Sequence, residues 1–132
     1  MEKIFVDASF FVALIKKDDS NHKKAKEIID RLNSVVQLHT NFICIGEAST
    51  VISQRVGKRQ ANELVNAYKN GDYFDLDVNK DVIFSATNLF LAQRSKNFPF
   101  FDAIHAAAME SVGLRKILTF DRHFKKLGFE IM

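Results

Sequence analysis

Apolar residues along this chain follow two alternating patterns. Short apolar runs such as Ile4-Phe5-Val6 are typical of strands that are buried on both faces of a parallel sheet. Between these runs, apolar residues recur every third or fourth position, as in Ala25, Ile28, Ile29 and Leu32, which is typical of a helix with one buried face. We therefore predict strands over residues 3–6, 35–38, 73–76 and 116–119, and an edge strand over 129–132.

Polar residues and glycines predict where the helices begin and end. Ser9 is predicted to cap a short helix that ends at Ile15, and Ser20 to cap a second helix. Either Thr40 or Asn41 is expected to cap a third, which runs to about Val56. The remaining helices are predicted over about residues 58–70, 80–95 and 101–112, with Asn79 as a cap and Gly57, Gly71 and Gly113 as helix stops.

Strands that alternate with helices in this way predict βαβ units, and hence an α/β fold around a parallel sheet. The length of 132 residues fits one domain, residues 1–132. Apolar residues make up 47% of the chain and charged residues 27%, which excludes an intrinsically disordered protein. Cys44 is the single cysteine, which excludes a disulfide scaffold.

Neither a membrane span nor a signal peptide is recognisable. The longest purely apolar run is Phe10–Ile15, far short of the roughly 18 residues that a spanning helix needs. Asp7 interrupts the apolar N-terminus, unlike the continuous apolar core of a signal peptide. We therefore expect a reducing, cytoplasmic location and no membrane partner.

The charge balance favours a polyanionic partner only weakly. There are 19 basic and 16 acidic residues, a net charge of +3. The basic residues cluster over residues 16–26, 55–59 and 115–126, which fits either nucleic-acid binding or simply solvated helix faces. The 13 phenylalanines have no polar atom and are expected mainly in the core.

Four acidic residues stand in positions that suggest a shared site. Asp7 and Asp121 each follow a predicted strand, where parallel α/β sheets place their ligand sites, although aspartate is also common in ordinary turns. Glu47 and Asp102 lie in almost wholly apolar helical segments, where a carboxylate is costly to bury without a partner. The alternatives are a solvent-facing Glu47 and an Asp102 that only complements the helix dipole.

Bringing four carboxylates together requires compensation for their mutual repulsion. A hard divalent cation supplies it, and ligands that offer only oxygen favour magnesium or manganese over zinc. Such metals polarise phosphoryl oxygens and generate a hydroxide-like nucleophile from water. An acidic quartet on a basic protein therefore suggests hydrolysis of phosphodiesters.

These residues also carry a family resemblance. The segment Ile4-Phe5-Val6-Asp7-Ala8-Ser9 resembles the opening motif of PIN domains. The segments around Glu47, Asp102 and Asp121 resemble the other three acidic motifs, in the same order and across nearly the whole chain. The size resembles that of the VapC toxins of type II toxin–antitoxin systems.

The resemblance implies a PIN-like three-layer α/β/α sandwich with a short, mostly parallel sheet. It also implies an Mg²⁺- or Mn²⁺-dependent ribonuclease that acts on RNA, forms homodimers and is inhibited by a small antitoxin protein. By the same resemblance, Asp7, Glu47, Asp102 and Asp121 are the catalytic and metal-binding residues, with Asp7 and Asp102 as direct ligands. The hydroxyls of Ser9 and Thr119 would support the site through hydrogen bonds.

Other candidate side chains are better explained by structural roles. His105 is expected to be a packed or hydrogen-bonded core residue, and His123, two residues after Asp121, a plain loop residue, with contact to a phosphate backbone as the alternative. Cys44 has no basic neighbour in sequence that would lower its pKa and is expected to be a small buried apolar group. A zinc site made of Cys44, His22 and His39 lacks the usual ligand spacing.

Two other functions remain open from the sequence alone. A receiver-like signalling domain has a similar length, but it needs paired acids after the first strand, where Asp7 stands alone. A non-catalytic PIN-like module that only binds RNA or protein would have lost site acids, and none is missing here. The apolar segment Phe10–Ile15 and the many phenylalanines further suggest an apolar surface that a homodimer would cover.

Overall fold

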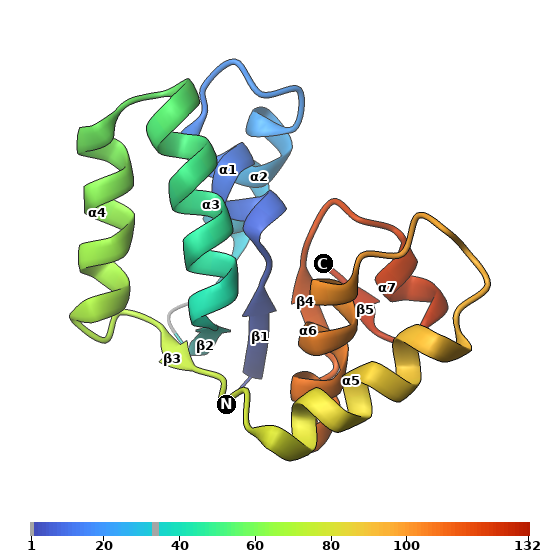
Figure 1. The fold of residues 1–132 in the computed structure, drawn as a ribbon. Helices are drawn as coiled ribbons and strands as arrows, with labels where there is room; N and C mark the ends of the chain where they lie inside the picture. Colours follow the sequence, from blue (N-terminus) through green and yellow to red (C-terminus); the bar gives the residue numbers. More distant parts are fainter. Residues whose placement is uncertain (1, 33–34) are drawn as a thin grey trace.

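A single parallel sheet forms the centre of the fold in the computed structural model, which describes residues 2–32 and 35–132. Over those residues the strands lie in the order β3-β2-β1-β4-β5, and every neighbouring pair is parallel (Figure 1). The predicted α/β class with a parallel sheet is therefore confirmed. The strands are β1 Glu2–Val6, β2 Val36–Thr40, β3 Phe74–Asp75, β4 Lys116–Leu118 and β5 Glu130–Ile131.

Helices connect the strands and fall into two groups. In Figure 1, α1 to α4 lie together at the left and α5 to α7 at the right, with β1 between the groups. No helix in the described ranges is long and apolar enough to cross a membrane. The helices are α1 Ala8–Ile15, α2 His22–Arg31, α3 Phe42–Arg55, α4 Lys58–Lys69, α5 Lys80–Ala92, α6 Phe100–Ser111 and α7 His123–Lys126.

The central strand explains the layered architecture. Ile4, Phe5 and Val6 in β1 are all buried, with at most 2% of their surface exposed. Successive side chains of a strand point to opposite faces, so both faces of the sheet must be covered. This burial on both sides is what the predicted α/β/α sandwich requires.

The strand register brings the ends of β1 and β4 together. Val6 pairs with Leu118, and the backbone N–H of Asp7 donates to the carbonyl of Leu118 at 3.0 Å. The chain runs from β1 to β2 on one side of the sheet, whereas β4 is added on the other side. Sheets of this kind bind ligands beyond the carboxyl ends of the strands at such a reversal of strand order. Asp7 and Thr119 lie at that point.

Two predicted helix caps are wrong by one or two residues. Asp7, rather than Ser9, occupies the N-cap position of α1, and Asn21, rather than Ser20, that of α2. Ser9 lies inside α1, and its hydroxyl bonds to Asp7 and to the backbone N–H of Phe120 instead of capping the helix. The caps at Asn41 and Asn79 are confirmed, since their side chains accept from the backbone N–H groups of Cys44 and Val82.

Candidate active site

The four acids predicted from sequence line one pocket of about 540 Å³ at the carboxyl end of the sheet. Asp7 follows β1, Glu47 lies on α3, Asp102 lies in the first turn of α6 and Asp121 follows β4. Four distant segments therefore place carboxylates in a single hollow. Asp7 and Asp102 are buried, Asp121 is partly buried, and Glu47 is exposed at the rim.

Hydroxyl groups hold the carboxylate of Asp7 from one side. Its Oδ2 accepts a hydrogen bond from Thr119 Oγ1 at 2.8 Å and another from Ser9 Oγ at 3.1 Å. Ser9 Oγ in turn accepts from the backbone N–H of Phe120, and Thr119 Oγ1 accepts from that of Asp121. These bonds tie the start of α1 to the loop after β4, so Asp7 has a fixed place between the two.

Asp102 has a neighbour that sequence reasoning underrated. His123 Nε2 contacts the Oδ2 of Asp102 as a close ion pair or hydrogen bond. Burial first, and then the charge of Asp7, raise the pKa of Asp102 from 3.8 to about 7, although His123 acts in the opposite direction. His123 begins the short helix α7, which had no clear hydrophobic repeat to predict it.

The remaining acids respond to the same crowding. Burial and the charge of Asp7 raise the pKa of Asp121. Burial, followed by the charges of Asp7 and Asp121, raises the pKa of Glu47. The acids of this pocket thus destabilise one another's charged forms, which is the electrostatic situation that a bound cation relieves.

The arrangement includes a group of potential metal ligands. Side-chain atoms of Asp102, Asp121 and His123 all lie within 4.8 Å of one another. Carboxylate oxygens are the ligands that Mg²⁺ and Mn²⁺ prefer. Asp7 is close enough to this group for its charge to raise the pKa of both Asp102 and Asp121. The donor set fits a hard divalent cation better than a soft one.

The pocket also contains residues that were not predicted. Asp19 and Asn21, from the turn before α2, line it, as does the exposed ring of Phe101. Asp19 accepts from the backbone N–H of Asn21, a local arrangement that reads as an ordinary turn in the sequence. Nothing in the sequence distinguished that turn or Phe101 from ordinary residues on the protein surface.

The zinc alternative is not supported by the described geometry. His22 Nδ1 lies 2.8 Å from the backbone oxygen of Ala13, and His39 stacks on Phe74. The polar side chains next to Cys44 are instead Asp7 and His105. His105 is fully buried against Phe5, as expected for a structural histidine.

Several known proteins are similar to this chain in sequence or in fold. The chain is 29% identical over 126 residues to the 23S rRNA-specific endonuclease VapC20 of Mycobacterium tuberculosis. This alignment covers 96% of this chain and 95% of VapC20. The crystal structure of VapC20, described as a toxin that cleaves the sarcin-ricin loop, superposes with a TM-score of 0.88, 26% identity and 98% coverage of both chains.

A more distant structure shares the fold. The VapBC2 structure from Rickettsia felis, bound to a DNA fragment, matches with a TM-score of 0.67 at 14% identity, over 98% of this chain and 97% of that one. The family model of the PIN domain matches residues 4–130, which include all four acids of the pocket. The chain therefore belongs to the PIN domain family.

Proposed function

We propose that this protein is a metal-dependent endoribonuclease that hydrolyses RNA phosphodiester bonds and acts as the toxin of a toxin–antitoxin pair. The observation that carries the proposal is the convergence of Asp7, Glu47, Asp102 and Asp121 in one pocket. The activity named for the VapC20 relative supports it. Asp7, Asp102 and Asp121 are the proposed direct ligands, and Glu47 the ligand at the rim.

The chain's own residues would prepare the site for Mg²⁺ or Mn²⁺. The bound cation would polarise the phosphoryl oxygen and lower the pKa of a water molecule. Asp7 would offer a carboxylate that Ser9 and Thr119 hold in place through the hydrogen bonds to its Oδ2. His123 would orient the carboxylate of Asp102 through their direct contact.

Basic residues beside the pocket suggest how RNA would be held. The part of the pocket lining that the structure describes includes no lysine or arginine. Lys17, Arg55 and Arg59 line a neighbouring hollow, and Arg55 lies one turn of α3 beyond Val51 of the pocket. These basic side chains, beside the pocket and not in it, would bind the phosphates that flank the scissile bond, so that the carboxylates of the pocket stay free to bind metal.

A cleavage assay tests the proposal directly. Purified protein is incubated with total RNA and with isolated 23S rRNA, the substrate class named for the VapC20 relative. We expect discrete cleavage with Mg²⁺ or Mn²⁺, loss of cleavage with a chelator, and recovery when the metal is restored; end-mapping gives the cut position. Cleavage that persists in the chelator would exclude the metal-dependent chemistry.

The same acids are the proposed target of an antitoxin. A pocket with this concentration of carboxylates would accept an arginine or lysine in place of the cation. The VapBC2 structure from Rickettsia felis, which shares the fold, supports a protein partner. We expect Asp102→Asn to weaken antitoxin binding as well as cleavage, and high salt to weaken binding further. Affinity measured for wild type and variant at two salt concentrations checks this, and equal affinities would place the inhibitor on another surface.

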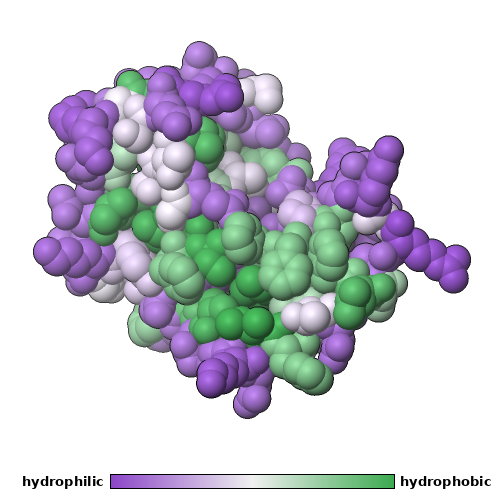
Figure 2. Space-filling model, in the orientation of Figure 1, coloured by the Kyte–Doolittle hydropathy of each residue, from purple (hydrophilic) through white to green (hydrophobic). Residues whose placement is uncertain are grey.

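A homodimer is proposed from the apolar surface around α5 and α6. The segment Phe10–Ile15 does not supply that surface, because Phe10, Phe11 and Ala13 are buried in the core. Figure 2 shows apolar residues gathered in a continuous band across this face of the molecule. The ring centroid of Phe100 lies 5.4 Å from that of Phe90 and 6.5 Å from that of Phe101, and these three residues are 39–50% exposed. Phe84 and Leu91 on α5 are 70% and 75% exposed. Exposed aromatic and aliphatic residues in such number usually mark an interface.

Sedimentation tests this surface. We expect a dimer for the wild type and a monomer for Phe84→Gln combined with Leu91→Gln, because the two changes remove the apolar area that pairing would bury. Val65→Gln is the matched control, since Val65 is also exposed, at 41%, but lies on α4 in the other group of helices. A monomeric wild type at micromolar concentration would contradict the dimer.

A further inference from the structure

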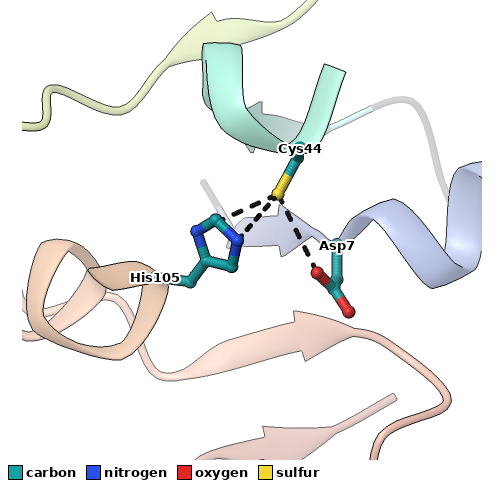
Figure 3. A group of neighbouring side chains, drawn as sticks. All are labelled: Asp7, Cys44 and His105. Atoms are coloured by element: carbon teal, nitrogen blue, oxygen red, sulfur yellow. Dashed lines mark hydrogen bonds between the residues drawn. The ribbon is translucent and has the colours of Figure 1, made fainter. Parts of the chain in front are cut away.

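A row of buried polar side chains leads from the start of α3 to Asp7. Asn41, Cys44 and His105 each have no exposed surface. Figure 3 shows the sulfur of Cys44 between the ring of His105 and the carboxylate of Asp7. Polar groups are costly to bury unless they are hydrogen-bonded, so the direction of each bond in this row can be worked out.

The first hydrogen bonds of this row are made by Asn41, the N-cap residue of α3. Asn41 Oδ1 accepts from the backbone N–H of Cys44 at 2.9 Å, which fixes the orientation of the amide. Its Nδ2 therefore faces His105 Nδ1, 3.0 Å away, and must be the donor. Nδ1 of His105 is consequently an acceptor and carries no proton.

The proton of His105 then lies on the other nitrogen. Burial lowers the pKa of His105 to about 4, so the ring is neutral and its single N–H is on Nε2. Nε2 lies 3.4 Å from Cys44 Sγ and Nδ1 lies 4.0 Å from it, so the nearer, protonated Nε2 is the nitrogen that donates to the sulfur.

The thiol continues the row to the site. Because the sulfur already accepts from His105, its own S–H is directed to Asp7 Oδ1 at 3.9 Å. The hydrogen bonds thus run in one direction, from Asn41 through His105 and Cys44 to Asp7.

We infer that Asn41, His105 and Cys44 are positioning residues, which orient the carboxylate of Asp7 for the cation through a directed row of buried hydrogen bonds. The inference rests on the proposed function, because it assigns these residues to a metal ligand of that site. Oδ2 of Asp7 is held by Ser9 and Thr119, and Oδ1 by Cys44, so both oxygens are restrained. Partners of this kind typically change metal affinity by about 10- to 100-fold when they are removed.

Substitutions at Cys44 separate positioning from packing. Cys44→Ala removes the donor to Asp7, and we expect the Mn²⁺ dissociation constant, measured by electron paramagnetic resonance, to rise about 10-fold. Cleavage should fall at low Mn²⁺ and recover at saturating Mn²⁺. Cys44→Ser keeps a donor and should retain most of the affinity. Ile45→Val is the control for a small loss of buried volume next to Cys44 on the same helix.

The ring of His105 offers a readout that does not depend on any variant or on activity. Nitrogen-15 NMR of the wild-type protein should show a neutral ring protonated on Nε2 from pH 6 to 8. A ring protonated on Nδ1 would overturn the inference. So would Mn²⁺ affinity unchanged in Cys44→Ala, or weakened equally in Cys44→Ala and Cys44→Ser, which would indicate packing alone.

Failure of the proposed function and failure of the positioning role give different results. A wild type that neither binds Mn²⁺ nor cleaves RNA would overturn the proposed function and, with it, the positioning of a metal ligand. A wild type that does both, with Cys44→Ala behaving like it, would overturn only the positioning.

Discussion

Asp7→Asn is expected to abolish metal-dependent RNA cleavage, with a loss of at least about 100-fold in rate, while the protein stays folded. The amide keeps the shape of the carboxylate but removes the charge that would hold the cation. Asp7 is buried at the end of β1, at the meeting point of Ser9, Thr119 and Cys44, so its place cannot be taken by a neighbouring acid. Initial rates on a mapped substrate measure the loss.

Ser9→Ala gives a graded comparison for this prediction. It removes one of the two hydroxyl donors to Asp7 Oδ2 and leaves the carboxylate in place, so a loss of about 10-fold is expected. Circular dichroism and the melting temperature verify that both variants are folded. Cleavage by Asp7→Asn at the wild-type rate would place the activity elsewhere on the molecule.

Asp102→Asn is expected to stabilise the metal-free protein at pH 8 while it removes activity. The pKa of Asp102 is raised to about 7 in the folded protein, from 3.8, chiefly by burial and by the charge of Asp7. The folded state therefore binds this proton more tightly than the unfolded chain, so the free energy of unfolding falls as the pH rises from about 3.8 to about 7. Asparagine carries no charge at either pH and avoids this cost.

Thermal melts at pH 5 and pH 8, in a chelator, measure the effect. At pH 8 we expect the variant to melt several degrees above the wild type, for a gain of about 1–3 kcal/mol. At pH 5 the gain should be smaller, because the wild type loses this stability progressively between the unfolded pKa of 3.8 and the folded pKa of about 7. Mg²⁺ should raise the melting temperature of the wild type at pH 8 but not that of the variant. A variant that is less stable than the wild type at pH 8 would contradict the electrostatic account.

The acidic pocket could be anticipated because its residues obey simple placement rules. Asp7 and Asp121 follow apolar runs, and strands of a parallel sheet deliver such residues to one edge. Asp102 and Glu47 are conspicuous as charges in apolar helical segments. The fold class followed from the alternation of short apolar runs with helical repeats, which local sequence expresses directly.

The details that sequence missed depend on contacts between distant segments. His123 contacts Asp102, which lies 21 residues earlier in the chain. The helix α7 that holds His123 has only four residues and is too short to show a hydrophobic repeat. Serine is a residue type that often caps helices, but the hydroxyl of Ser9 accepts a hydrogen bond from the backbone N–H of Phe120, 111 residues away. Local propensity cannot anticipate a competing partner at that distance.

The parallel pairing of β1 with β4 has a consequence for the order in which the protein becomes active during its synthesis. Asp7 is made almost at once, but Thr119 and Asp121 follow more than a hundred residues later, after most of the chain has left the ribosome. A growing chain therefore holds the first acid without the strand that fixes it. Under the proposed function, translation would produce no working nuclease until β4 is inserted beside β1, because a product that ends before β4 lacks both Asp121 and the hydroxyl of Thr119 that holds Asp7.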